Sequence, residues 1–237
     1  MSDSLVSVSG LCKSYGAHSV LNGVEFSLPA GQIVGLFGPN GCGKTTLLKI
    51  MSGLIHDYTG ELLIDGRKIG PATKSIVAFL PDRMHLPEWM NAAQAIGYFA
   101  DFFADFDKDK ATGLLHSFSL SEKQKIKSMS KGMQEKLLLL LTMSRRARLY
   151  LLDEPIGGVD PAARAAILDF IMRNHAPDST IIMSTHLIND LEQIFSHVIF
   201  LGNGKILLND SVDNIRSYDK SIEDVFKEVF RDAWQIN

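Results

Sequence analysis

Residues 38–45, Gly-Pro-Asn-Gly-Cys-Gly-Lys-Thr, limit the possible folds of this chain more than any other segment. They match the pattern of a phosphate-binding loop, in which glycines allow successive backbone N–H groups to converge on phosphate oxygens. An apolar run at 33–37 precedes the loop, and helical spacing begins at Gly43. Because the pattern requires this strand–loop–helix context, the segment predicts a nucleotide phosphate site in a fold of strands and helices.

The residue types in this loop have distinct chemical roles. The N-terminus of the following helix adds positive potential at the phosphates. Lys44 is expected to reach the β- and γ-phosphates and to take part in catalysis, and Thr45 is expected to offer its hydroxyl to Mg²⁺. The predicted nucleotide-binding residues of the segment are Gly38, Pro39, Asn40, Gly41, Cys42, Gly43, Lys44, Thr45 and Thr46.

A second apolar run, at 149–152, ends in two carboxylates, Asp153 and Glu154. Strand ends of an open parallel sheet meet at the ligand crevice, so both are expected beside the phosphate loop. Asp153 is expected to hold Mg²⁺ through water, and Glu154 to act as general base on the attacking water. A solvated acidic strand end is the alternative, but a carboxylate pair after a buried strand favours catalysis.

The order of the predicted elements indicates the fold class. Alternating apolar and polar residues at 5–8 and 24–28 predict half-buried strands, and strand–helix alternation follows. We expect one α/β P-loop NTPase domain over residues 1–237, with a mixed, largely parallel core sheet, an antiparallel β layer and a helical subdomain at about 83–145. Helical spacing from about Ile188 predicts a further helix, and a capping pattern at Ser221 predicts a short C-terminal helix at about 221–233.

Composition limits the partners and the location. The net charge of −3 gives no basic excess, so no nucleic-acid partner is expected. The apolar run at 137–141 is far shorter than the roughly 20 residues that span a bilayer, and residues 1–10 show no signal-peptide pattern. Two cysteines form no disulfide framework, which fits a reduced, cytosolic compartment.

Three more short motifs occur in a set order around the second strand. Met-Ser-Lys-Gly-Met at 129–133 precedes it, Gly-Gly-Val-Asp at 157–160 follows it, and Ser-Thr-His at 184–186 follows the next apolar run. With the phosphate loop, this order makes the chain resemble the ATP-binding cassette (ABC) family over nearly its whole length. The resemblance implies an ABC-type nucleotide-binding domain, an ATPase that binds ATP and Mg²⁺ and serves a transporter.

The resemblance also implies roles for residues outside the phosphate loop. Tyr15 matches the aromatic that stacks on adenine, although packing on an edge strand is an alternative. Asp82 occupies the Q-loop position, where a Mg²⁺ contact is implied, and His186 stands where the family has its catalytic switch histidine. The other implied nucleotide-binding residues are Ser130 and Gly132 of the signature motif and Asp160 of the D-loop.

The family resemblance implies two protein partners. One is a second ABC ATPase subunit in a head-to-tail homodimer or heterodimer, in which each signature helix caps the γ-phosphate on the other subunit. The other is a membrane-spanning permease, which would place the chain on the cytoplasmic face of the cell membrane. Trp89 and Met90 are expected on the permease-docking surface, and Lys131 is expected either to act across the dimer or to be a solvated helix-end lysine.

Departures from the common family pattern narrow the expected function. Asp82 replaces a glutamine, and Lys131 and Met133 replace a glycine and a glutamine, as in a subset that serves type-2 exporters, including bacitracin-type systems. Export is therefore expected, with a soluble ATPase of iron–sulfur cluster assembly as the alternative. Glu154 disfavours a non-hydrolysing regulatory binder. Cys42 replaces a small residue and is expected to be a reactive thiol that nucleotide protects, or else a buried space-filler.

Overall fold

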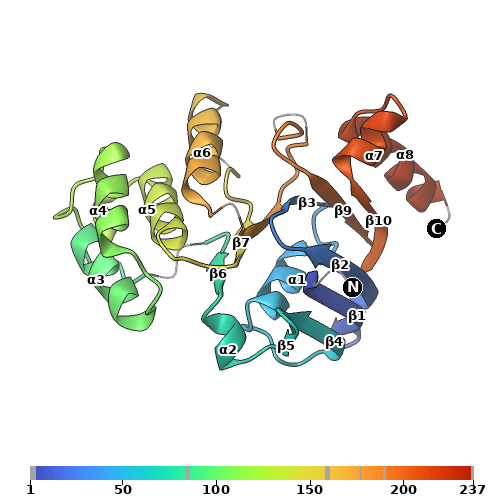
Figure 1. Cartoon of the computed structure of the whole chain (residues 1–237), viewed down its shortest axis with the longest axis horizontal. Coiled ribbons are helices and arrows are strands. Elements are labelled where there is room, and N and C mark those ends of the chain that lie inside the picture. The colour runs from blue at the N-terminus through green and yellow to red at the C-terminus, as the bar shows by residue number, and fades with distance from the viewer. Residues whose placement is uncertain (1–3, 84–85, 158–160, 177, 189–190, 236–237) are drawn as a thin grey trace.

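The structure is a computed structural model that describes residues 4–83, 86–157, 161–176, 178–188 and 191–235 (Figure 1). Two sheets form the body of the protein. Helices α3, α4 and α5 lie at one end, on the left in Figure 1, and α7 and α8 lie at the other end. Within the described residues, no helix is long and apolar enough to cross a membrane.

The smaller sheet is antiparallel, with the strand order β2-β1-β4-β5. Its first two strands are longer than the alternation at 5–8 and 24–28 predicts. Asp65 and Gly66 join β4 to β5 with φ of 53° and 69°, the left-handed values that a two-residue type I′ hairpin turn requires. The strands are β1 (Ser4–Tyr15), β2 (His18–Pro29), β4 (Thr59–Ile64) and β5 (Arg67–Lys68).

The larger sheet has the order β10-β9-β3-β8-β7-β6. Its strands pair in parallel except β10, which returns antiparallel to β9 through the turn at Asn203 and Gly204. The mixed core sheet and the antiparallel layer are therefore arranged as the sequence predicts. The strands are β3 (Ile33–Phe37), β6 (Val77–Leu80), β7 (Leu149–Asp153), β8 (Thr180–Ser184), β9 (His197–Gly202) and β10 (Lys205–Ser211).

Helices flank the larger sheet, and three of them lie within the expected helical subdomain at 83–145. That subdomain boundary and the single-domain organisation stay predictions. The helices are α1 (Lys44–Met51), α2 (Pro71–Lys74), α3 (Ala92–Phe102), α4 (Lys108–Ser117), α5 (Lys131–Met143), α6 (Pro161–Asn174), α7 (Val212–Ser217) and α8 (Ile222–Gln235), with a 3₁₀ turn at Ile126–Ser128.

The prediction of a helix from about Ile188 is wrong for the residues that the structure describes there. Residues 191–194 form turns, with the N–H of Leu191 donating to the carbonyl of Ile188 and the N–H of Ile194 donating to that of Leu191. Leu191 and Phe195 are both buried in the core. These two side chains reach the core from a short connection to β9. Their burial determines the backbone conformation there, rather than the helical spacing of apolar residues in the sequence.

Each face of the larger sheet covers its own apolar core, because side chains alternate along a strand. On β7, Leu149 and Leu151 belong to the core beneath the antiparallel sheet and α1. Tyr150 and Leu152 belong to the core shared with α3, α4 and α5. Both faces of β7 are thus buried, which explains its unbroken apolar run.

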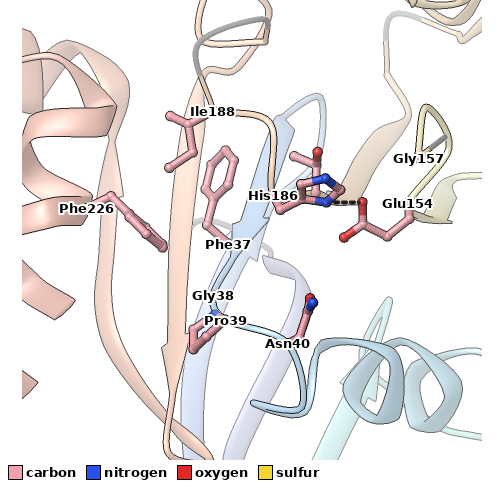
Figure 2. Close-up of a pocket in the computed structure, with 10 residues that line it drawn as sticks. Phe37, Gly38, Pro39, Asn40, Glu154, Gly157, His186, Ile188 and Phe226 are labelled. Atoms are coloured by element: carbon pink, nitrogen blue, oxygen red, sulfur yellow. Dashed lines mark hydrogen bonds and ion pairs between the residues drawn. The ribbon is translucent and has the colours of Figure 1, made fainter. Parts of the chain in front are cut away.

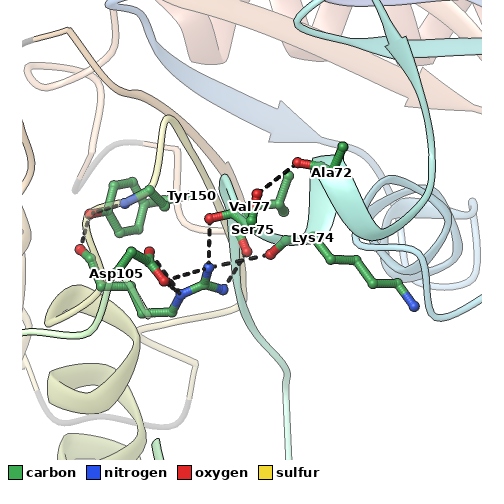
Figure 3. A network of polar contacts seen from close by, with 8 residues as sticks. Ala72, Lys74, Ser75, Val77, Asp105 and Tyr150 are labelled. Atoms are coloured by element: carbon green, nitrogen blue, oxygen red, sulfur yellow. Dashed lines mark hydrogen bonds and ion pairs between the residues drawn. The ribbon is translucent and has the colours of Figure 1, made fainter. Parts of the chain in front are cut away.

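A buried guanidinium joins the helices at 83–145 to the sheet (Figure 3). Arg145 follows α5, and its side chain is only 4% exposed. Its Nε donates to both Asp105 carboxylate oxygens at 3.1 Å, and its Nη1 donates to the carbonyl of Val77 on β6 at 2.6 Å. Nη2 donates to the carbonyls of Lys74 and Ser75 at 3.3 and 3.1 Å. One side chain therefore ties four separate backbone or side-chain groups together.

Candidate functional site

The phosphate-binding loop connects β3 to α1 and is closely packed against β9. A Cβ added to Gly38 would lie 2.1 Å from the carbonyl oxygen of Leu201, so no side chain fits there. Gly43 caps α1 with φ of 111°, a left-handed conformation that favours glycine. Lys44 is buried, and its ammonium donates to the carbonyls of Gly38 at 2.7 Å and Pro39 at 3.2 Å. The loop therefore holds the lysine charge directly beneath itself.

Asp153 ends β7 and is 1% exposed. Its Oδ1 accepts a hydrogen bond of 2.6 Å from the hydroxyl of Ser184, which lies opposite it in the register of β7 with β8. Its Oδ2 is buried and has no hydrogen-bond partner within the described residues. A buried carboxylate oxygen without a partner is costly, so this atom is the natural place for a cation or a bound water.

Glu154 follows with φ of 50°, a strained value for a non-glycine residue. The N–H of Glu154 donates to the hydroxyl of Ser184 at 3.0 Å, which helps to hold this turn. The Nδ1 of His186, beyond the end of β8, lies 3.0 Å from Oε2 of Glu154 (Figure 2). Burial raises the pKa of Glu154, and the neighbouring His186 and Lys44 oppose that rise. A carboxyl with a raised pKa next to a histidine is typical of a general acid–base site.

Two cavities open around the phosphate loop. One, of about 580 Å³, lies between the loop, Glu154 and His186, and its far wall is apolar (Figure 2). The other, of about 310 Å³, lies over the loop and the start of α1, and brings Thr45, Asp82 and Asp153 together. Asp82 is exposed, with Oδ2 3.9 Å from Nε of Arg83. The three predicted metal-binding residues thus share one cavity.

The two cavities include most, but not all, of the predicted site. Tyr15 lines neither cavity. The residue is 51% exposed, and the ammonium of Lys13 lies 4.6 Å from the centroid of its ring. Ser130 caps α5 by accepting a 3.3 Å hydrogen bond from the N–H of Met133, and both it and Gly132 are exposed away from these cavities. Asp160 lies outside the described residues.

The expectation of a reactive Cys42 is wrong. The side chain is 7% exposed and belongs to the core beneath the antiparallel sheet. Its sulfur sits under the loop, where it would be 2.6 Å from a Cβ on Gly38. Burial raises the pKa of the thiol, and the charge of Lys44 only partly opposes this. Cys42 is therefore a space-filling residue of the loop rather than a ligand-facing thiol.

The prediction that Met90 lies on the permease-docking surface is also wrong. It is 7% exposed and lies in the core shared with α3 and α5, whereas Trp89 is 65% exposed. Only Trp89 of this pair can reach a docking partner. Sequence reasoning also missed Ser184, which holds both Asp153 and Glu154. The one signal for it is a small polar residue that ends an otherwise apolar strand.

The fold and this site define a P-loop ATP-binding protein. The ABC transporter family model matches residues 21–157, more than half of the chain, and the chain belongs to this family. Its members hydrolyse ATP in transport, and the chain is the ATP-binding subunit of an ABC transporter. The predicted family and α/β P-loop fold class are confirmed.

Individual relatives agree with this assignment. The uncharacterized ABC transporter ATP-binding protein YxlF of Bacillus subtilis is 29% identical over 223 residues, covering 92% of this chain and 74% of YxlF. The lantibiotic transport ATP-binding protein SrtF of Streptococcus pyogenes is 26% identical over 224 residues, covering 94% and 96%. A solved structure of an ATP binding subunit of an ABC transporter has a TM-score of 0.86 at 28% identity, covering 95% of this chain and 99% of that one.

Proposed function

We propose that the chain hydrolyses Mg-ATP at the phosphate-binding loop, dimerises when it binds ATP, and in this way drives export through a membrane permease. The observation that carries the proposal is the contact between Glu154 and His186 at 3.0 Å, beside the buried Asp153 and the loop lysine. These groups supply a base, a partner for that base and a cation for the phosphates within one pair of adjoining cavities.

The donors present suit Mg²⁺. Asp153 offers the unpartnered Oδ2, and the Thr45 hydroxyl and the Asp82 carboxylate line the same cavity. Mg²⁺ usually takes one or two carboxylates, with waters and substrate phosphates, rather than a complete protein cage. The described residues contain no cluster of three or more His, Cys, Asp or Glu arranged for a metal. The ion, when bound, would neutralise charge on the phosphate oxygens.

Each of the other residues has one task in the proposed reaction. Lys44 turns its ammonium from the loop carbonyls to the β- and γ-phosphates, because it already lies inside the loop. The Glu154 carboxylate takes a proton from the attacking water. His186 fixes Oε2 of that carboxylate, so the second oxygen faces the water, and its ring contacts the γ-phosphate.

A second subunit completes the proposed site. Ser130 and Gly132 are exposed at the N-terminus of α5, where backbone N–H groups attract anions, but they do not line the loop cavities of their own chain. A head-to-tail partner, either a second copy or a second ABC ATPase subunit, would bring this helix end to the γ-phosphate. Asp160 and Lys131 are proposed contributors to nucleotide binding at that interface, and Tyr15 is proposed to stack on adenine.

Glu154→Gln tests hydrolysis and dimerisation together. The amide keeps the shape of the side chain but removes the base, so kcat should fall by roughly 10²- to 10⁴-fold while ATP binding persists. Size-exclusion chromatography with Mg-ATP should then show a trapped dimer. Glu25→Gln, the same change at an exposed position of β2, is the matched control and should leave both measurements unchanged. A Glu154→Gln chain that binds ATP yet stays monomeric contradicts the proposed mechanism.

The permease and the direction of transport need a separate experiment. Export is supported by the lantibiotic transport function in the name of SrtF and by the departures at Asp82 and Lys131. Tagged chain isolated from detergent-solubilised membranes should carry a multi-span membrane protein, and Trp89→Ala should weaken that association. Recovery with soluble iron–sulfur assembly proteins instead would overturn the transport proposal.

A further inference from the structure

The apolar wall opposite His186 includes a residue from the far end of the sequence. Phe226 of α8 lines the 580 Å³ cavity together with Phe37 and Ile188 (Figure 2). Ile188 lies two residues beyond His186 and is 8% exposed. The buried side chain of Ile188 therefore holds the backbone close to His186, and it lines the same cavity as Phe226 of α8.

Aromatic contacts link α8 to the segment after His186. The ring of Phe226 meets Phe200 of β9 edge-on at 5.3 Å between centroids. Phe200 meets Phe37 at 5.9 Å, and Phe37 meets Phe195 at 5.4 Å. Phe195, like Ile188, lies between β8 and β9, so a row of ring contacts joins Phe226 of α8 to Phe195.

Hydrogen bonds fasten the same connection to α7 and α8. The N–H of Ile222, the first residue of α8, donates to Oε1 of Glu192 at 3.2 Å. The guanidinium of Arg216 on α7 donates to the backbone carbonyl of Glu192 at 3.4 Å. A carboxylate at a helix N-terminus satisfies a backbone donor and complements the helix dipole. Glu192 thus connects the C-terminal helices to the chain that follows His186.

The side chain of His186, six residues before Glu192, is held by fewer contacts. Its side chain is 57% exposed, and its ring is held by the contact with Glu154. The position of the imidazole is consequently set by the backbone on either side. On the upstream side the N–H of Thr185 donates to the carbonyl of Leu36 on β3 at 3.3 Å. On the downstream side Ile188 is buried in the core, and Glu192 accepts hydrogen bonds from α7 and α8.

We propose that α8 positions His186, through Phe226, which lines the same cavity wall as Ile188, and through Glu192, which caps the helix, and so sets the rate of hydrolysis. Phe226 and Glu192 are positioning residues, since each is proposed to act through the backbone that carries His186. The inference rests on the proposed role of His186 in hydrolysis.

Phe226→Ala tests the inference, with Phe230→Ala as the matched control. Both changes remove a phenyl ring from α8. The two rings contact Phe200 and lie 4.3 Å from each other between centroids, but Phe230 does not line the cavity, so only Phe226 adjoins the wall opposite His186. Phe226→Ala should lower kcat by about 10-fold with the KM for ATP within about two-fold, because misplacing a catalytic group lowers kcat rather than binding. Phe230→Ala should change kcat by less than about two-fold, and Phe226→Leu should restore most of the rate.

A spectroscopic measurement separates positioning from general loss of packing. The ring ¹⁵N and ¹H signals of His186, identified by their absence in His186→Gln, should shift in Phe226→Ala and stay in place in Phe230→Ala. Glu192→Ala should move the same signals, whereas Glu192→Gln retains a side-chain carbonyl acceptor for the Ile222 N–H and should not. The Glu192 pair keeps the test usable if Phe226→Ala does not fold.

The outcomes of these experiments distinguish the two proposals. If Glu154→Gln abolishes hydrolysis but Phe226→Ala and Glu192→Ala leave kcat and the His186 signals unchanged, the positioning role of α8 is wrong and the proposed function stands. If His186→Gln itself leaves kcat unchanged, the proposed role of the histidine is wrong. Equal losses of kcat in Phe226→Ala and Phe230→Ala, with no shift of the His186 signals, also overturn the inference.

Discussion

Arg145→Met is expected to be the most destabilising single change at the junction between the helices at 83–145 and the larger sheet. Methionine keeps the unbranched stem and fills similar space, but it removes every guanidinium donor. The change leaves the Asp105 carboxylate and the carbonyls of Val77, Lys74 and Ser75 without their partner. It also removes the cation that lies 4.1 Å from the ring centroid of Phe103.

The expected magnitude follows from the burial of these groups. Removing one member of a buried ion pair costs about 3–5 kcal/mol, because the other member keeps a buried, uncompensated charge. Asp105 is 22% exposed and can be partly hydrated, which lowers the loss. The buried carbonyl of Val77 has no such relief, and an unsatisfied group of this kind costs about 1–3 kcal/mol. We therefore expect a total loss of about 3–5 kcal/mol.

Equilibrium unfolding in urea, followed by far-UV circular dichroism, measures this loss. Arg146→Met is the matched control, because the neighbouring arginine is 78% exposed and pairs with Asp107 at 3.0 Å on the surface. Exposed pairs contribute about 0–1 kcal/mol, so the control should unfold close to the wild type. If Arg145→Met loses no more free energy of unfolding than Arg146→Met, the buried network does not stabilise the junction as described.

Two further changes test the site. Ser184→Ala removes the donor to Oδ1 of buried Asp153, so the free energy of unfolding should fall by about 1.5–3 kcal/mol in urea titrations. The control Ser196→Ala, at an exposed hydroxyl, should lose less than half as much, and equal losses would contradict this account. Cys42 should label slowly with maleimide at neutral pH, with or without Mg-ATP, and faster as pH rises, because its raised pKa keeps the thiol protonated below that value; peptide mass spectrometry that finds rapid, nucleotide-protected labelling would contradict burial.

Parts of the molecule that depend on contiguous residues could be predicted from the sequence. The strand at 33–37, the loop and the start of α1 form one uninterrupted segment, and the strand before Asp153 is identified by its own apolar run. Both sheets follow from such local patterns, together with the tendency of parallel strands to alternate with helices. The contact of Glu154 with His186 agrees with the rule that strand ends meet at one edge.

The features that sequence analysis missed depend on packing between distant segments. Cys42 points inward because the loop crosses β9 so closely at Gly38, which no pattern within the loop encodes. Ser184 gains its role from the register of β7 against β8, two strands with a helix between them. Residues 191–194 form turns because the side chains of Leu191 and Phe195 are both buried in the core. In each case the local structure is determined by contacts with residues far away in the sequence.

The three strands that carry the phosphate loop, Asp153 and His186 each have a paired strand on both sides, in the order β9-β3-β8-β7-β6. Amides on such strands exchange with solvent only when the whole domain opens, whereas helices outside the sheet can open in smaller units. We therefore expect deuterium to enter α3 and α4 well before β3, β7 and β8. A partly opened molecule that has lost these outer helices would keep its phosphate loop and its carboxylates in register, ready to bind nucleotide again before the rest of the chain closes.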